Sequence, residues 1–98
     1  MKIMTIWRIP PENYKEAVDR FLETGAPYPD GLAVIGRWHV PGSTKGFLLV
    51  EGDDPTLLAQ HLSEWAGLLE FEVVPVIEDA DAGAAAQKAR DDRSEAKS

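Results

Sequence analysis

The chain has 98 residues, 44% of them hydrophobic, and it contains no cysteine. This length suits one domain, the apolar fraction excludes a wholly disordered chain, and the lack of cysteine excludes disulfides and thiolate chemistry. The formal net charge is −7, and the first 78 residues hold twelve acidic side chains against six Lys and Arg. A negative surface repels phosphate backbones, so nucleic acid is not an expected partner.

The sequence also argues against a membrane protein and a metal site. No run approaches the roughly 20 apolar residues that cross a bilayer, and Met1 to Thr5 lack a signal-peptide pattern. We therefore expect a cytoplasmic protein with no membrane partner. Two histidines 22 positions apart, with scattered carboxylates, do not form a metal motif. No metal or other resident cofactor is expected.

The first part of the chain predicts a strand, a helix and a second strand. Residues 3–9 are rich in β-branched and aromatic side chains, and Pro10-Pro11 ends that strand and begins a helix. Gly25 is suited to end the helix, and residues 32–40 form the next predicted strand. One face of the helix carries apolar residues spaced by three and four: Tyr14, Ala17, Val18, Phe21 and Leu22.

The next part predicts a hairpin, a second helix and a fourth strand. Turn-forming residues 41–44 connect to a third strand at 46–51. Asp53-Asp54-Pro55 has the pattern of a helix start, Gly67 is suited to end that helix, and residues 71–77 predict the fourth strand. The apolar stripe of this helix is Leu57, Leu58, His61, Leu62 and Trp65.

This order, βαββαβ, predicts an α+β, ferredoxin-like domain over residues 1–79. Two right-handed βαβ crossovers place both helices on one face of an antiparallel sheet. Residues 80–98 are rich in alanine and favour helix, but they have no apolar stripe. We expect them to form a mobile or partly helical tail.

Both faces of the predicted sheet are apolar, which points to a homodimer. Alternation in the first strand puts Ile3, Thr5 and Trp7 on one face and Met4 and Ile6 on the other. Two helices cover only one face, so a second copy packing sheet against sheet would supply the missing layer. The alternative is a monomer whose second face is covered by loops and the tail.

Three segments resemble a family of small bacterial proteins that is known only as a domain of unknown function. They are residues 4–13 (MTIWRIPPEN), residues 36–39 (GRWH) and the stretch from Glu64-Trp65 to residues 69–76 (LEFEVVPV). The resemblance covers about residues 1–79 and implies the dimeric α+β barrel group. That group includes cofactor-free quinone-forming monooxygenases, haem-degrading enzymes, muconolactone-isomerase-like proteins and stress-response proteins, so it implies a fold and a dimer but no single activity.

A candidate ligand pocket lies between the predicted sheet and helices. It consists of four aromatic residues and one imidazole: Trp7, Tyr14, Trp38, His61 and Trp65. Gly36 lacks a side chain and would leave room beside Trp38. If these groups converge, they suit a planar hydrophobic ligand, and the resemblance implies the same location. The alternative is an ordinary aromatic core, because aromatic stripes at helical spacing usually serve packing.

A second candidate is a polar cluster in the opposite alternation phase. Its members are Arg8, Arg37, His39 and Glu72. Such a cluster inside a dimeric barrel could bind an anion, polarise a carbonyl or shuttle a proton. The alternative is an ion-pair network between subunits that fixes their register.

Three functions remain open from the sequence. The first is a binding or interaction module without catalysis, with the dimer as its functional unit. The second is a small cofactor-free enzyme, of the monooxygenase or isomerase type, acting on a planar hydrophobic substrate. The third is a binder of haem or another planar cofactor.

Overall fold

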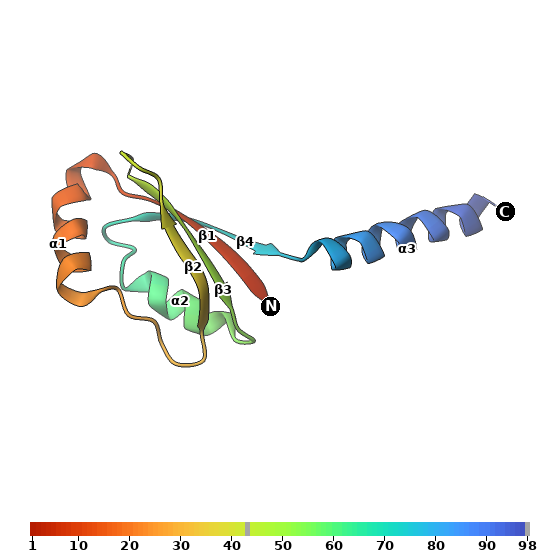
Figure 1. The fold of residues 1–98 in the computed structure, drawn as a ribbon, viewed down its shortest axis with the longest axis horizontal. Coiled ribbons are helices and arrows are strands. Elements are labelled where there is room, and N and C mark those ends of the chain that lie inside the picture. Colours follow the sequence, from red (N-terminus) through yellow and green to blue (C-terminus); the bar gives the residue numbers. More distant parts are fainter. Residues whose placement is uncertain (43, 98) are drawn as a thin grey trace.

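The chain forms one four-stranded antiparallel sheet with two helices beside it and a third helix beyond it (Figure 1). The computed structural model describes residues 1–42 and 44–97, so Ser43 of the predicted turn and Ser98 of the tail lie outside it. The strand order is β2-β3-β1-β4, which confirms the predicted α+β, ferredoxin-like fold. In chain order the elements are β1 (Lys2–Arg8), the 3-10 helix η1 (Pro11–Asn13), α1 (Tyr14–Thr24), β2 (Ala33–His39), β3 (Lys45–Glu51), α2 (Pro55–Ser63), β4 (Glu70–Val76) and α3 (Asp79–Lys97).

The helix boundaries follow the predicted signals with two differences, the first being that the prolines begin the 3-10 helix η1 and α1 itself starts at Tyr14. Gly25 ends α1 in the left-handed conformation at φ 70°, and the Asp54 carboxylate accepts a hydrogen bond from the Thr56 backbone N–H at the start of α2. However, α2 ends at Ser63, before the predicted end at Gly67. Trp65 therefore lies in the turns that follow the helix, where its carbonyl accepts the backbone N–H of two later residues.

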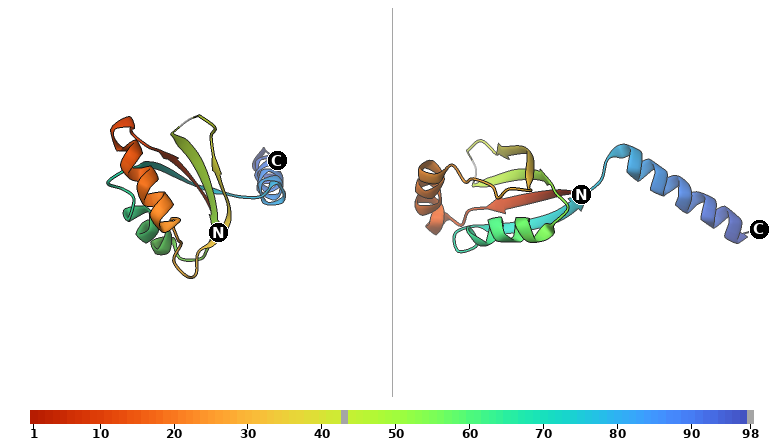
Figure 2. Two further views of the ribbon diagram at one scale, coloured as in Figure 1. Left: turned by 60° about the vertical axis from the view of Figure 1, so that its left-hand side comes forward. Right: turned by 90° about the horizontal axis from the view of Figure 1, so that it is seen from below.

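Helices α1 and α2 lie on one side of the sheet, as the left view of Figure 2 shows. The buried cluster on that side joins β1, β3 and α2 with the residue before β2: Ile3, Trp7, Leu32, Leu48, Val50 and Leu58. Helix α3 points away from the sheet, and its described side chains are exposed (Figure 1). Hence the described chain leaves the other face of the sheet uncovered.

None of the described helices is long and apolar enough to cross a membrane.

A β-bulge in β2 reverses the side-chain alternation of that strand. Val34 pairs with Val50, but the next register pair is Gly36 with Leu49, so Ile35 is the extra residue. Beyond the bulge, Arg37 pairs with the buried Leu48 and shares its face, toward the helices. Trp38 therefore lies on the uncovered face, with 51% of its surface exposed.

Candidate functional site

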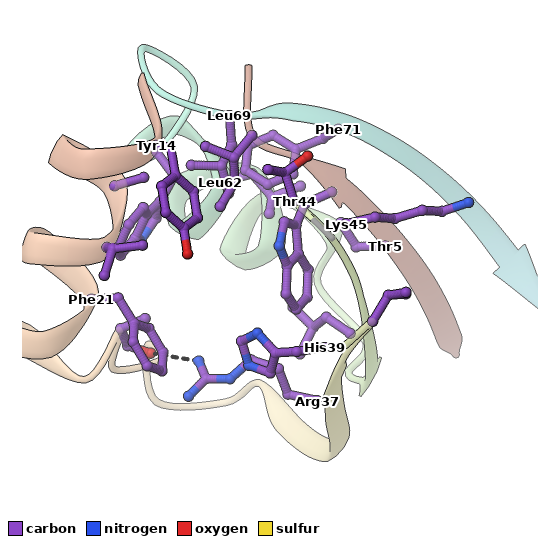
Figure 3. A pocket seen from close by; sticks show the side chains of 18 of the residues that line it. Thr5, Tyr14, Phe21, Arg37, His39, Thr44, Lys45, Leu62, Leu69 and Phe71 are labelled. Carbon is purple, nitrogen blue, oxygen red and sulfur yellow. Dashed lines mark hydrogen bonds between the residues drawn. The ribbon is translucent and has the colours of Figure 1, made fainter. Parts of the chain in front are cut away.

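A cavity of about 390 Å³ lies between the sheet and helices α1 and α2. Side chains from β1, β2, β3, β4, both helices and the loop after α1 line it. Figure 3 shows Tyr14, Phe21, His39 and Arg37 around an open centre, with Leu62, Leu69 and Phe71 above it in this view. Tyr14 is half exposed, so this side of the cavity reaches solvent.

Aromatic rings form much of the cavity wall. Trp7 is buried on β1, and its indole lies where a side chain at the opposite residue, Gly46, would be. Trp65 is buried on the other side of the cavity, where the Arg20 guanidinium lies 4.8 Å from its ring centroid. These rings give the cavity flat, apolar surfaces.

His39 lies at the exposed end of β2, between two aromatic rings. Its ring centroid is 5.2 Å from that of Trp7 and 5.8 Å from that of Phe21, and both contacts are edge-to-face. These contacts connect the sheet to α1 across the cavity. They also hold an imidazole where a bound molecule would meet it.

Arg37 is anchored at the side of the cavity formed by the loop after α1. Its guanidinium donates to the Tyr28 hydroxyl at 2.7 Å and to the Ala26 carbonyl at 3.4 Å, with the Gly25 carbonyl at 3.5 Å. It also lies 5.0 Å from the Phe21 ring centroid. The side chain is therefore fixed in position by neutral groups.

His61 is buried on α2 next to Tyr28, with ring centroids 4.7 Å apart. Burial lowers the pKa of His61, Glu64 opposes that effect, and the Arg37 charge adds to it. Burial also raises the pKa of Tyr28, although Arg37 opposes this change. At neutral pH this part of the cavity thus holds the neutral imidazole of His61, the neutral phenol of Tyr28 and the positive charge of Arg37.

Two residues that line the cavity each carry a buried polar atom that has no hydrogen-bond partner among the described residues. These atoms are the Thr5 hydroxyl oxygen and His61 Nδ1, on side chains that are 0% and 5% exposed. A buried polar group without a partner costs stability, so native proteins usually satisfy it by protein, water or ligand. Because neither atom is exposed in this structure, water or a bound molecule would reach it only after neighbouring side chains move.

Residues 1–90 match the family model described as Domain of unknown function (DUF3303). The chain belongs to this family. No curated protein matches the sequence. The family match supports the predicted resemblance to a family known only as a domain of unknown function. It assigns neither catalysis nor a ligand to the chain.

This DUF3303 chain brings together four of the five residues predicted for the pocket. Trp7, Tyr14, His61 and Trp65 all line the cavity. The placement of Trp38 among them is wrong, because the bulge at Ile35 puts it on the uncovered face.

The predicted polar cluster is divided between the two faces of the sheet. Arg37 and His39 line the cavity, because the same bulge turns them toward the helices. Arg8 and Glu72 lie on the uncovered face, since Glu72 pairs with Ile6 across β1 and β4. The two strands are neighbours, but the four side chains do not form one site.

Several residues that line the cavity were missing from the predicted site. Thr5 and Phe71 share the alternation phase of Trp7, so the strand pattern contained a signal for both. Tyr28 lies in a proline-rich loop, where no periodicity indicates the direction of a side chain. The residues that line the cavity do not suggest a metal, and the described residues contain no group of three metal-ligating side chains.

Proposed function

We propose that this protein is a small-molecule binding module that holds a planar hydrophobic ligand between its sheet and its two helices. The cavity of about 390 Å³ and its aromatic walls carry the proposal. Ligand sites are typically concave, mostly apolar spaces of about 300–1,000 Å³ with a few polar groups. The cavity has this size and this composition.

Close packing offers a poorer account of the same residues. Protein interiors contain few voids larger than a water molecule, and an empty apolar space forfeits contacts that would stabilise the fold. Here large rings surround the space instead of filling it, and two buried polar atoms face no described partner. Both features favour a ligand over an ordinary aromatic core.

The three tryptophans allow a direct test of the binding site. We expect titration with 2-naphthol to shift the indole N–H resonances of Trp7 and Trp65 in a ¹H–¹⁵N NMR spectrum. Trp38 is an internal control, because it lies on the uncovered face and should not move. Trp38→Phe assigns its resonance without touching the cavity. Indole resonances of Trp7 and Trp65 that stay unchanged at millimolar 2-naphthol would contradict the proposal.

The functional unit that we propose is a homodimer with the two sheets face to face. The uncovered face carries partly exposed apolar side chains from all four strands: Met4, Ile6, Trp38, Phe47, Leu49 and Val74. It also carries Arg8 and Glu72, so a two-fold partner could pair each charge with its opposite. A second copy therefore suits this face in both apolar character and charge.

The buried imidazole supports a second candidate function, an isomerase-like enzyme. A neutral His61 can act as a general base, and its Nδ1 has no partner among the described residues. In such a reaction the imidazole takes a proton from a carbon next to a carbonyl. The C–H electron pair becomes the C=C bond of an enolate, and the imidazolium exchanges its proton with solvent before it returns a proton to a carbon of the enolate.

Hydrogen–deuterium exchange tests this second function. We expect the protein to accelerate deuterium uptake from D₂O at the acidic carbon of 2-tetralone, measured by NMR. His61→Gln should remove the acceleration while still binding 2-naphthol. Exchange at the rate of buffer alone would leave the protein as a binding module without this chemistry.

A further inference from the structure

We infer that the ligand of the cavity is an aromatic carboxylate whose negative group is bound by the Arg37 guanidinium. This inference rests on the proposed binding function and adds the chemical class of the ligand. Four observations support it: the neutral partners of Arg37, the charges around the cavity, the rings that hold the guanidinium and its position.

Arg37 has no negative partner among the described residues. Its three hydrogen-bond acceptors are the Tyr28 hydroxyl and the backbone carbonyls of Ala26 and Gly25, all of them neutral. The ion pairs between described residues involve other cations. A partly buried guanidinium without a counter-charge is costly, and a bound carboxylate would remove that cost.

The cavity lacks the acidic residues that are abundant elsewhere in the chain. The protein contains 17 Asp and Glu residues, yet none of them is among the described residues that line the cavity. Arg37 places a positive charge at the cavity, while the Lys45 ammonium lies 5.5 Å from the Phe47 ring centroid on the uncovered face. In a protein of net charge −7, a cavity that has a cation and no acidic side chain among its described lining residues favours a negative ligand.

The surroundings of Arg37 fix the plane of its guanidinium. Phe21 and Tyr28 lie 5.0 and 5.3 Å from the guanidinium carbon, measured to their ring centroids. Figure 3 shows the guanidinium beside the open centre, between Phe21 and His39. An arginine held in this way is suited to a flat, bidentate carboxylate, while the rings beyond it hold a flat apolar body.

Two probes with the same ring system separate charge from shape. We compare 2-naphthoate with 2-naphthol, which is neutral at pH 7, by isothermal titration of the full chain. We expect 2-naphthoate to bind about tenfold more tightly, since one charge-assisted pair supplies that difference. Arg37→Met should remove the preference, so that 2-naphthoate loses about tenfold more affinity than 2-naphthol, whose own loss measures the general change in the cavity wall. Lys15→Met is the matched control, because Lys15 is an exposed cation of α1 outside the cavity.

The outcomes distinguish this inference from the proposed function. Equal affinities for the two probes would overturn the carboxylate and leave the binding function intact. Binding of neither probe would overturn both. If Arg37→Met does not fold, both probes are titrated into the wild-type protein at low and at high salt. The preference for 2-naphthoate should shrink in high salt, because salt screens a charge contact. A preference that does not depend on salt would contradict the contact.

Discussion

Trp7 and Gly46 lie directly opposite each other on β1 and β3, and the Trp7 indole occupies the space that a side chain at Gly46 would need. The glycine therefore lets a large ring lie flat against the sheet at the cavity wall. His39 pairs with Gly46 from the other side and contacts the same indole. One missing side chain thus determines the positions of two site residues.

Replacing Gly46 with alanine should destabilise the protein and displace Trp7. The added Cβ would overlap the indole, and overpacking of this kind costs about 1–3 kcal/mol. Urea denaturation measures the loss, and a shift of the Trp7 indole N–H resonance in a ¹H–¹⁵N NMR spectrum reports the movement of its ring. Gly67→Ala is the control, because nothing lies within 4 Å of a Cβ there. Equal stabilities of the two variants would show that the ring does not depend on Gly46.

Thr5→Val should stabilise the ligand-free protein. The Thr5 hydroxyl is fully buried without a described partner, and valine has nearly the same shape without the polar atom. We expect a gain of about 1 kcal/mol in the free energy of unfolding. The matched control is Thr24→Val, which should lower stability, because Thr24 donates to the Arg20 carbonyl and accepts from the Ala26 N–H. A loss of stability in Thr5→Val would mean that the hydroxyl has a partner, such as an ordered water.

His61 should make the protein less stable in mild acid. Burial lowers its pKa in the folded state below the ordinary 6.5, so the unfolded chain binds a proton more readily than the folded chain. The stability contributed by the neutral imidazole is therefore complete above pH 6.5. It is lost as the pH falls from there through the folded-state pKa.

His61→Gln isolates this effect, because the carboxylates titrate in both proteins and cancel in the difference. The gap in unfolding free energy between wild type and variant should shrink from pH 8 to pH 5, as measured by urea denaturation. A gap that stays constant would show that His61 has the same pKa in the folded and unfolded chains.

The fold was predictable because local signals and the overall pattern agree. Pro10-Pro11 and Asp54-Pro55 mark where the two helical segments begin, Gly25 marks where α1 ends, and the strands lie within one or two residues of their predicted positions. These signals depend on backbone geometry and on periodicity, which a single sequence contains. Two right-handed crossovers then place both helices on the same face of the sheet.

The site was predictable only in part, because one extra residue changes which face a side chain occupies. Strict alternation groups Trp38 with Trp7 and separates Arg37 from the cavity, and the bulge at Ile35 reverses both assignments. Nothing in residues 32–40 marks that bulge beyond the presence of Gly36. Arg37 and its contact with Tyr28 also depend on a loop conformation that periodicity does not describe.

The uncovered face of the sheet gives the prediction on assembly. Leu49 lies near the middle of this face, on β3, where it pairs with Met4 and Gly36 of the two neighbouring strands. Leu49→Glu would place a charge in the core of a sheet-to-sheet interface, where burial of an unpaired carboxylate is very unfavourable. We therefore expect the wild-type protein to be a dimer and Leu49→Glu a folded monomer, measured by native mass spectrometry at micromolar concentration.

Leu22→Glu is the matched control for this experiment. Leu22 is 74% exposed on α1, on the helix side of the sheet, so the same change of charge should leave the dimer intact. Circular dichroism checks that both variants keep the fold. A monomeric wild-type protein would refute the dimer. A dimer that survives Leu49→Glu would place the interface elsewhere, because a buried carboxylate at the centre of packed sheets could not be tolerated.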